Sequence, residues 1–291
     1  MSVPLVLVHG GAGDVPEDRR ERHARGCLEA ARAGGAVLAA GGSAVEAAVA
    51  AVRVLEDDPV YNAGRGCALT RDGHVSLDAA VMDGATLDVG AVAVLPPFRN
   101  PIAVAHALLR EPEVLLAGPE AGRWAEAHGF EPVAEDELIT DAVRARLAEA
   151  LREGRARNFA GGTVGAVARD VEGRLAAATS TGGTMGKAPG RIGDSPVVGA
   201  GTYACAEAAV SATGDGESFL RSVFAARLAD AVAAGADPAA ELRRRLEEAR
   251  DRYAGLGGAI LLTPEGPPLR AWTSRGMSHG WWSPEDEGCG I

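Results

Sequence analysis

The sequence is poor in the residues that usually form metal, cofactor and disulfide sites. Aromatic residues make up only 4% of it, so a hydrophobic core must consist mainly of Ala, Val and Leu. Its four cysteines lie far apart without a CxxC spacing, which indicates neither a zinc site nor a disulfide framework. Its six histidines form neither an HExxH motif nor a close pair. The sequence therefore predicts catalysis without a metal or another cofactor.

Positive charge is also scarce. The chain has 29 basic and 40 acidic residues, giving a formal net charge of −11 at pH 7, which disfavours nucleic acids and anionic membranes as partners. The basic run 243–245 is followed by Glu247 and Glu248, so it indicates a solvated helix face rather than a basic patch. No apolar run is long enough to span a bilayer, and the first residues lack the regions of a signal peptide. We therefore expect a cytoplasmic protein.

The motifs are spread over the whole length with no linker between autonomous halves, which favours a single domain over residues 1–291, and the expected strands and helices indicate the α+β class. Strands are expected at 3–8, 74–82, 89–95, 175–178, 208–213, 257–262 and 269–273, and directly after Thr163. Helices are expected at 17–32, 43–55, 119–128, 140–153, 217–233 and 238–252, with another opening at Asn100-Pro101. The helices are grouped in sequence, which predicts two mostly antiparallel sheets between helix layers. The stretch 152–162 lacks apolar periodicity and is expected to be an exposed loop.

Thr163 is the residue that most directly indicates a chemistry. It follows Gly161-Gly162 and precedes a short apolar run typical of a buried strand. It could be an ordinary β-branched residue that opens a strand. A cut between Gly162 and Thr163, however, would give Thr163 both a hydroxyl nucleophile and a free α-amino group to act as its base.

Three later segments favour the nucleophile. Thr181 ends a second apolar run, and a Thr213-Gly214 turn lies further along. Between them, Arg191 and Asp194 are either a surface ion pair or a clamp for an amino-acid head group. In the clamp, the Arg191 guanidinium would bind the α-carboxylate in a bidentate manner, and Asp194 would bind the α-ammonium.

Together these segments resemble the plant-type L-asparaginase / isoaspartyl peptidase family, which consists of threonine-type N-terminal nucleophile (Ntn) hydrolases. The resemblance extends over nearly the whole chain and includes the segments 9–13, 55–66, 77–84 and 99–102. It implies a four-layer αββα sandwich of the Ntn-hydrolase type. It also implies self-cleavage into chains 1–162 and 163–291, and a dimer of such processed units.

The same resemblance implies roles for individual residues. Five of them would be catalytic: Thr163, Thr181, Thr213, Gly214 and Asn62. Thr181 would hydrogen-bond Thr163, and the Thr213 side chain and Gly214 N–H would stabilise the oxyanion. Asn62 would position water or support the site, and its alternative is a turn residue. Asp215, at a position that varies in the family, is expected to influence which acceptor is preferred.

A loop early in the chain resembles the family's sodium-binding loop. Its corresponding residues are Leu55, Glu56, Asp58, Tyr61, Ala63 and Arg65. The resemblance implies that backbone carbonyls, which suit a hard monovalent cation, would hold a structural Na⁺ there.

The sequence thus predicts a self-processing hydrolase that cleaves the side-chain amide of L-asparagine and of β-aspartyl dipeptides and releases L-aspartate. One alternative is a glycosylasparaginase of the same superfamily, which usually carries Asp where this chain has Gly162. A second is a glycine-rich binding protein that stays uncut and keeps Arg191 and Asp194 as a ligand clamp. A third is a protein-cutting relative, which the clamp for a free amino-acid head disfavours.

Overall fold

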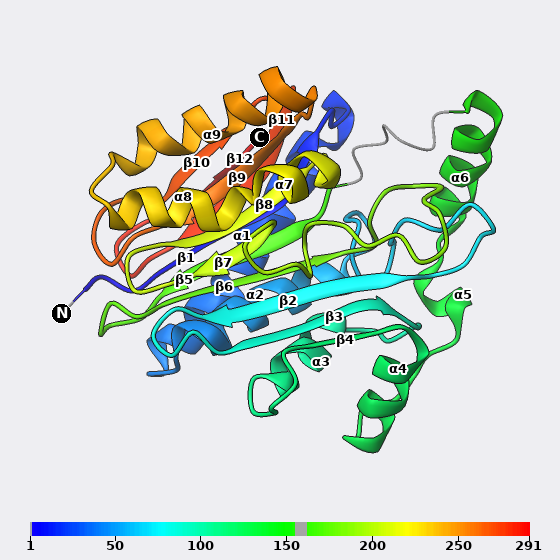
Figure 1. Cartoon of the computed structure of the whole chain (residues 1–291), viewed down its shortest axis with the longest axis horizontal. Coiled ribbons are helices and arrows are strands. Elements are labelled where there is room, and N and C mark those ends of the chain that lie inside the picture. The colour runs from blue at the N-terminus through cyan, green and yellow to red at the C-terminus, as the bar shows by residue number, and fades with distance from the viewer. Residues whose placement is uncertain (1, 155–161) are drawn as a thin grey trace.

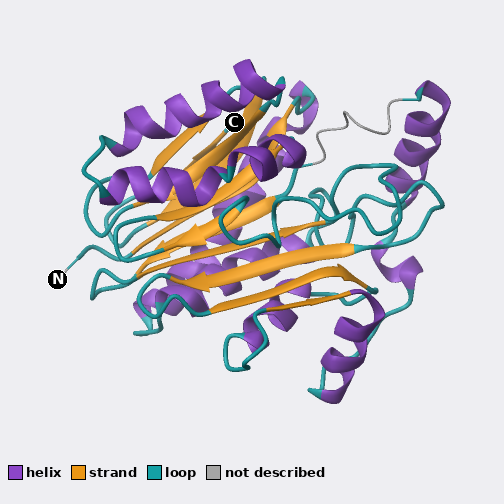
Figure 2. Ribbon diagram, in the orientation of Figure 1, coloured by secondary structure: helices purple, strands orange, loops and turns teal. Residues whose placement is uncertain are grey.

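The computed structural model describes residues 2–154 and 162–291, which form a mixed α+β fold with two β-sheets (Figures 1 and 2). The strands are β1 (Leu5–Gly13), β2 (Leu77–Asp83), β3 (Val89–Leu95), β4 (Leu115–Ala117), β5 (Val164–Arg169), β6 (Leu175–Thr181), β7 (Thr202–Ala204), β8 (Ala209–Gly214), β9 (Gly257–Leu262), β10 (Leu269–Trp272), β11 (Gly276–Trp282) and β12 (Glu287–Gly290). The helices are α1 (Glu17–Ala39), α2 (Ala44–Asp57), α3 (Pro101–Leu108), α4 (Gly118–Ala127), α5 (Glu135–Leu138), α6 (Asp141–Glu153), α7 (Gly216–Ser222), α8 (Phe224–Ala233) and α9 (Pro238–Tyr253).

Both sheets are mostly antiparallel, as the sequence predicts. In the described part of the chain, the larger sheet has the strand order β12-β11-β1-β5-β6-β2-β3-β4, and only β3 and β4 pair in parallel. The smaller sheet has the order β10-β9-β8-β7. The neighbouring strands β5 and β6 at the centre of the larger sheet carry Thr163 at the entry of one and Thr181 at the end of the other.

Small and branched apolar side chains form the core on both faces of the larger sheet. In β1, Val6 and Val8 pack into a cluster with α1 and α2, whereas Leu5 and Leu7 face a second cluster shared with Ile260 of the smaller sheet. This alternation follows from the two-residue period of a strand. A third cluster joins the smaller sheet to α8 and α9, which run along one side of the molecule in Figure 1. The strands that carry the site are therefore buried on both faces.

The expected elements are largely present, but several boundaries differ. Ser43 caps α2 in a capping box with Glu46, as the sequence predicts. The single helix expected over 217–233 is broken between α7 and α8 at Val223, whose φ is +48°. Strands β4, β7, β11 and β12 were not anticipated. Arg152 lies in the last turn of α6 rather than in a loop, and 155–161 lie outside the described residues.

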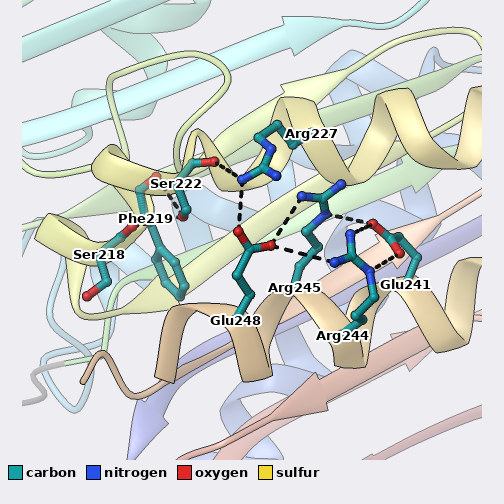
Figure 3. Close-up of polar contacts among 8 residues, drawn as sticks. All are labelled: Ser218, Phe219, Ser222, Arg227, Glu241, Arg244, Arg245 and Glu248. Carbon is teal, nitrogen blue, oxygen red and sulfur yellow. Dashed lines mark hydrogen bonds and ion pairs between the residues drawn. The ribbon is translucent and has the colours of Figure 1, made fainter. Parts of the chain in front are cut away.

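Ion pairs within α9, and one between α8 and α9, confirm the interpretation of the basic run near residue 244 as a helix face (Figure 3). On α9, Arg244 and Arg245 both bind the carboxylate of Glu241, at 2.7 Å and 2.6 Å. Glu248 also binds Arg245, at 3.3 Å, and it accepts a 3.2 Å hydrogen bond from Arg227 of α8. These basic side chains are therefore neutralised locally and do not form a patch for an anionic partner. No helix among the described residues is long and apolar enough to cross a membrane.

Candidate active site

The pairing of β5 with β6 brings Thr163 against Thr181. Val164 is opposite Ser180 in the antiparallel register. Thr163, just before Val164, therefore lies opposite Thr181, just after Ser180. The Thr163 hydroxyl donates a 3.1 Å hydrogen bond to the Thr181 hydroxyl oxygen. The same oxygen accepts a 2.9 Å hydrogen bond from the backbone N–H of Gly183. Both threonines are buried, so the hydroxyl of Thr163 is held in one direction by a network that excludes bulk water.

The peptide bond before Thr163 packs against a bulge in β1. The β1–β11 register shifts between His9 and Ala12, and Gly11 adopts a φ of +109° there. A Cβ on Gly11 would lie 2.1 Å from the Cα of Gly162, and a Cβ on Gly162 would lie 2.4 Å from the Cα of Gly11. Only glycine at both positions permits this backbone approach. Packing against Gly11 therefore requires a glycine at position 162, in addition to any need for chain flexibility before Thr163.

The same bulge holds Thr213. The backbone N–H of Ala12 donates a 3.1 Å hydrogen bond to the Thr213 hydroxyl oxygen. Because that oxygen accepts from Ala12, its own proton is left for an acceptor in the site. The next residue, Gly214, ends β8 with a φ of +141°, and a Cβ there would lie 2.4 Å from Gly257. The segment before Thr163 and the Thr213 side chain are thus anchored by consecutive residues of one bulge.

Arg191 is paired with a residue that sequence reasoning missed. Its Nε donates to Glu217 Oε1 at 3.0 Å, and its Nη2 donates to Glu217 Oε2 at 2.8 Å. Burial disfavours the charge of Arg191, but the hydrogen bond to Glu217 and the negative charges of Glu217, Asp194 and Asp78 together outweigh this effect and raise its pKa. The alternative of a surface Arg191–Asp194 ion pair is wrong, because the hydrogen-bonded carboxylate belongs to Glu217 and Asp194 is buried. The only sequence feature that pointed to Glu217 is its position as a carboxylate three residues after the Thr213-Gly214 turn.

Asp194 is a fully enclosed carboxyl group. Burial raises its pKa to about 7, opposed by a hydrogen bond from its own backbone N–H and by the charge of Arg191. Its Oδ2 atom has no hydrogen-bond partner among the described residues. A Cβ on Gly201 would lie 2.5 Å from Oδ2, and a Cβ on Gly216 would lie 2.6 Å from Oδ1. A buried carboxyl oxygen without a partner is costly, and a ligand ammonium would satisfy it.

Asp78 and Lys187 form a second buried pair of charges beside these residues. Lys187 Nζ donates to the backbone oxygen of Ser76 at 2.7 Å, and burial lowers its pKa against the attraction of Asp78. Asp78 accepts a 2.8 Å hydrogen bond from Val94 N–H, and burial raises its pKa. A Cβ on Gly183 would lie 3.0 Å from Lys187 Nζ and 3.1 Å from Arg191 Nη1. The turn that holds Thr181 therefore touches both cationic side chains.

Asn62 supports this turn rather than pointing into open space. Its Nδ2 donates to the backbone oxygen of Gly183 at 2.7 Å, and its Oδ1 accepts from Ala68 N–H at 2.6 Å. Its backbone oxygen accepts from Gly182 N–H at 3.0 Å. These contacts tie the loop before residue 68 to the 182–183 turn. The Gly183 N–H of that turn donates to the Thr181 hydroxyl oxygen.

A chain of buried hydroxyl groups lies between the two sheets beneath the site. Ser211 Oγ lies 2.9 Å from His9 Nε2 and 2.7 Å from Thr179 Oγ1. Thr202 donates to Thr179 at 2.7 Å and lies 2.9 Å from the backbone oxygen of Ser195, next to Asp194. Burial lowers the pKa of His9 to about 3, against a raising contribution from the Thr163 backbone. His9 is therefore a neutral structural residue at neutral pH.

The segment 55–65 is only partly a loop. Leu55 and Glu56 belong to the last turn of α2, and Leu55 is fully buried. The backbone oxygen of Glu56 accepts a 2.8 Å hydrogen bond from Arg65 N–H, which closes the segment. Asp58 is ion-paired with Arg22 at 2.6 Å. The hydroxyl of Tyr61 donates to the backbone oxygen of His23 at 2.6 Å, so these side chains are engaged within the protein.

The residues chosen from the sequence thus lie in two linked groups. One group is built around the nucleophile candidate and comprises Thr163, Thr181, Thr213, Gly214 and Asn62. The other is the charged group Arg191 and Asp194, to which the structure adds Glu217, Asp78 and Lys187. Gly183 and Gly216 lie beside Arg191, because a Cβ on Gly183 would lie 3.1 Å from its Nη1 and a Cβ on Gly216 3.0 Å from its Nη2.

Proteins similar in sequence identify the family of this chain. A protein-family model described as asparaginase matches residues 2–288. The chain belongs to the asparaginase family. Among similar family members, an isoaspartyl peptidase/L-asparaginase from Danio rerio is 39% identical over 98% of this chain and 93% of its own. The human isoaspartyl peptidase/L-asparaginase is 41% identical over 94% of this chain and 91% of its own. An isoaspartyl peptidase from Salmonella typhimurium is 40% identical over 97% of this chain and 96% of its own.

Proposed function

We propose that the protein is an isoaspartyl peptidase and L-asparaginase that hydrolyses the side-chain amide of L-asparagine and of β-aspartyl dipeptides. The observation that carries this proposal is the hydrogen-bonded pair Thr163–Thr181, accompanied by a half-buried Arg191 and a buried Asp194. Further support comes from family membership and from relatives named for these two activities.

The active form would arise by self-cleavage between Gly162 and Thr163. The Thr163 hydroxyl attacks the Gly162 carbonyl carbon, the peptide C–N bond breaks, and the acyl group moves from nitrogen to oxygen. Water then hydrolyses this ester, which leaves a carboxylate on Gly162 and a free hydroxyl and α-amine on Thr163. The tight contact between Gly162 and Gly11 supports this step, because it fixes the scissile carbonyl relative to the hydroxyl. The products are chains 1–162 and 163–291.

The new α-amine would act as the general base. A free α-amine has a reference pKa of roughly 7.7–8.0, so a sizeable fraction is neutral near neutral pH. It takes the proton of the Thr163 hydroxyl as that oxygen attacks the substrate amide carbonyl. The proton then passes to the departing ammonia or amino acid, and an aspartyl ester remains on the enzyme. Water attacks the ester, L-aspartate leaves, and the Thr163 hydroxyl is restored.

Other residues would bind the substrate and its oxyanion. The Thr213 hydroxyl and Gly214 N–H donate to the oxygen that becomes negative in the tetrahedral intermediate. Arg191 binds the α-carboxylate of the aspartyl part, and Asp194 accepts hydrogen bonds from its α-ammonium. The unpartnered Asp194 Oδ2 supports this assignment, because an ammonium group would satisfy it.

We also propose the finer architecture that the family resemblance implies. The three apolar clusters support a four-layer αββα sandwich of the Ntn-hydrolase type, because they lie between helices and sheet, between the sheets, and between sheet and helices. Processed units would associate as a dimer, which size-exclusion chromatography with light scattering tests directly.

A structural Na⁺ would lie at the segment 55–65. The described residues contain no cluster of three His, Cys, Asp or Glu side chains suited to a metal, and Asp58 is already paired with Arg22. Backbone carbonyls are thus the donors that this segment offers, and such neutral oxygens suit a hard monovalent cation. Their bound cation would stiffen the segment that carries Asn62. Thermal unfolding in NaCl compared with choline chloride tests this, and equal Tm values would contradict it.

The proposed activity is tested with three substrates. The matured protein is incubated with L-asparagine, β-Asp-Leu and N-acetylglucosaminyl-asparagine, and released aspartate is measured. We expect activity with the first two and a loss of at least about a thousandfold in Thr163→Ala. Preference for the glycosylated substrate would favour the glycosylasparaginase alternative. Hydrolysis of none of them, with binding of aspartate retained, would favour an amino-acid-binding protein.

A further inference from the structure

A cavity of about 720 Å³ extends outward from the Arg191–Glu217 pair. Its lining combines the turn after β6, the segment around α7, one residue before β2 and one from α6. The residues that line it are Arg71, Leu151, Thr184, Gly186, Lys187, Ala188, Arg191, Asp215, Glu217 and Arg221. Ligand pockets of about 300–1,000 Å³ accommodate molecules well above the size of one amino acid. The aspartyl part of a substrate, bound at Arg191, would therefore fill only one end.

The cavity is basic although the protein is acidic. Four of its side chains are cationic and two are anionic, in a chain with a net charge of −11. Arg191 is bonded to Glu217, and Lys187 is buried beside Asp78. The carboxylate of Asp215 is bonded to the hydroxyl of Ser218. The positive charge that remains available to a ligand is on Arg71 and Arg221.

These two arginines have no ion-pair partner within the ranges 2–154 and 162–291 that the structure describes. Some exposed arginines elsewhere are ion-paired, as Arg174 is with Asp170 and Arg227 is with Glu248. Arg71 is fixed at the cavity through its backbone N–H, which donates to the Lys187 oxygen at 2.9 Å. Arg221 ends α7 and is close enough to Glu217 for its charge to lower the pKa of that carboxyl.

We propose that Arg71 and Arg221 form a subsite for the α-carboxylate of the leaving amino acid of β-aspartyl dipeptides. The inference rests on the proposed function and names the substrate class within it. Arg191 and Asp194 take the head group of the aspartyl part, and the reacting carbonyl lies at Thr163. The rest of the dipeptide must then occupy the remaining cavity. Every free dipeptide carries a carboxylate there, whereas asparagine releases only ammonia and uses no such contact.

Asp215 helps to direct the leaving-group carboxylate to Arg71 and Arg221. It follows the Thr213-Gly214 turn directly and lines the same cavity. Its negative charge repels a second carboxylate placed next to the turn, so the leaving carboxylate is directed outward to the arginines. An acidic side chain on the leaving residue is disfavoured for the same reason.

The test compares β-Asp-Leu with its C-terminal amide, which differ only in that carboxylate. The wild-type ratio of kcat/KM values, acid over amide, is expected to be about two to five, the range of an exposed ion pair. Arg71→Ala and Arg221→Ala should each lower the ratio toward one. Arg221→Lys should retain part of the wild-type ratio, and 0.5 M NaCl should lower the ratio by screening the charges. Arg243→Ala removes an arginine of α9 outside the cavity and should leave the ratio unchanged.

The possible results distinguish a failure of the proposed function from a failure of the arginine subsite. If the wild-type protein hydrolyses neither asparagine nor the two leucine substrates, the proposed function fails. If it hydrolyses acid and amide equally well, the function stands and the arginine subsite is overturned. A ratio that survives in the Arg71→Ala/Arg221→Ala double variant also overturns it. Circular dichroism and the extent of maturation of each variant show that a changed ratio does not come from misfolding, which would lower both rates together.

Discussion

The hydroxyl of Thr163, at the entry of β5, donates a 3.1 Å hydrogen bond to the hydroxyl of Thr181, at the end of β6. Thr181 has its own position fixed by the N–H of Gly183, and Gly183 is held by Asn62. A short relay of ordinary hydrogen bonds thus determines where the Thr163 oxygen lies. Each link in it can be broken separately, which makes the proposed chemistry testable.

Removing the Thr181 hydroxyl should slow both self-cleavage and turnover. Thr181→Val keeps the shape and the β-branched fit to a strand but cannot accept from Thr163, so the nucleophile loses its orientation. We expect a fall of about 10- to 100-fold in both rates, the value of one hydrogen bond to a reacting group. Thr181→Ser retains the hydroxyl and should keep most of the activity. Equal rates for the Val and Ser variants would show that the hydrogen bond has no part in the reaction.

Glu217 should affect substrate binding through Arg191. Glu217→Gln weakens the bidentate contact that aims the guanidinium, which has 15% of its side-chain surface exposed. We expect KM for asparagine to rise about 3- to 10-fold while kcat changes little, because the reacting groups are untouched. Glu247→Gln on the surface of α9 is a matched control. A fall in kcat at constant KM would place Glu217 in the chemistry instead.

Substrate binding should weaken below neutral pH. Burial raises the pKa of Asp194 to about 7, so below that pH the carboxyl is protonated and loses its charge attraction for the substrate ammonium. KM should therefore fall as the pH rises from 6 to 8, whereas titration of the α-amine proposed for Thr163 should act on kcat. Steady-state kinetics over this range separate the two effects. A KM that is constant with pH would mean that Asp194 is already ionised at pH 6.

The close approach of Gly11 and Gly162 makes a steric prediction. Gly11→Ala places a Cβ 2.1 Å from the Gly162 Cα, whereas Gly41→Ala, at a φ of +83°, meets nothing within 4 Å. Both substitutions cost about 1–2 kcal/mol for a positive φ, but only the first displaces the scissile segment. We expect maturation to stop or slow strongly in Gly11→Ala and to proceed in Gly41→Ala. Normal cleavage in both would show that the bulge does not position the bond.

The sequence predicted the parts of the site that depend on local pattern. The hydrogen bond expected between Thr163, after two glycines, and Thr181, at a strand end, is present. The oxyanion role of Thr213 and Gly214 stays a prediction. The partner of Arg191 could not be predicted, because Asp194 lies only three residues away in sequence, whereas Glu217 lies 26 residues away and reaches the guanidinium only through the tertiary fold. The role of Ala12 in holding Thr213 was also hidden, since it depends on a backbone N–H.

Two features of the fold escaped prediction for similar reasons. The strand at 276–282 is composed of Gly, Met, Ser, His and Trp, without the alternation that marks a half-buried strand. It exists because β1 offers it a paired edge. The break at Val223 places a β-branched residue at a positive φ, which local propensity disfavours and which the packing of α7 and α8 must stabilise.

The most direct test of the account is the intact mass of the purified protein after incubation at neutral pH, with N-terminal sequencing of any new fragment. We predict two fragments, one of which begins Thr-Val-Gly at Thr163 and ends at Ile291, and their absence in Thr163→Ala. A chain that stays at 29.6 kDa yet hydrolyses asparagine, or a cut at another bond, would contradict the assignment of Thr163 as an N-terminal nucleophile.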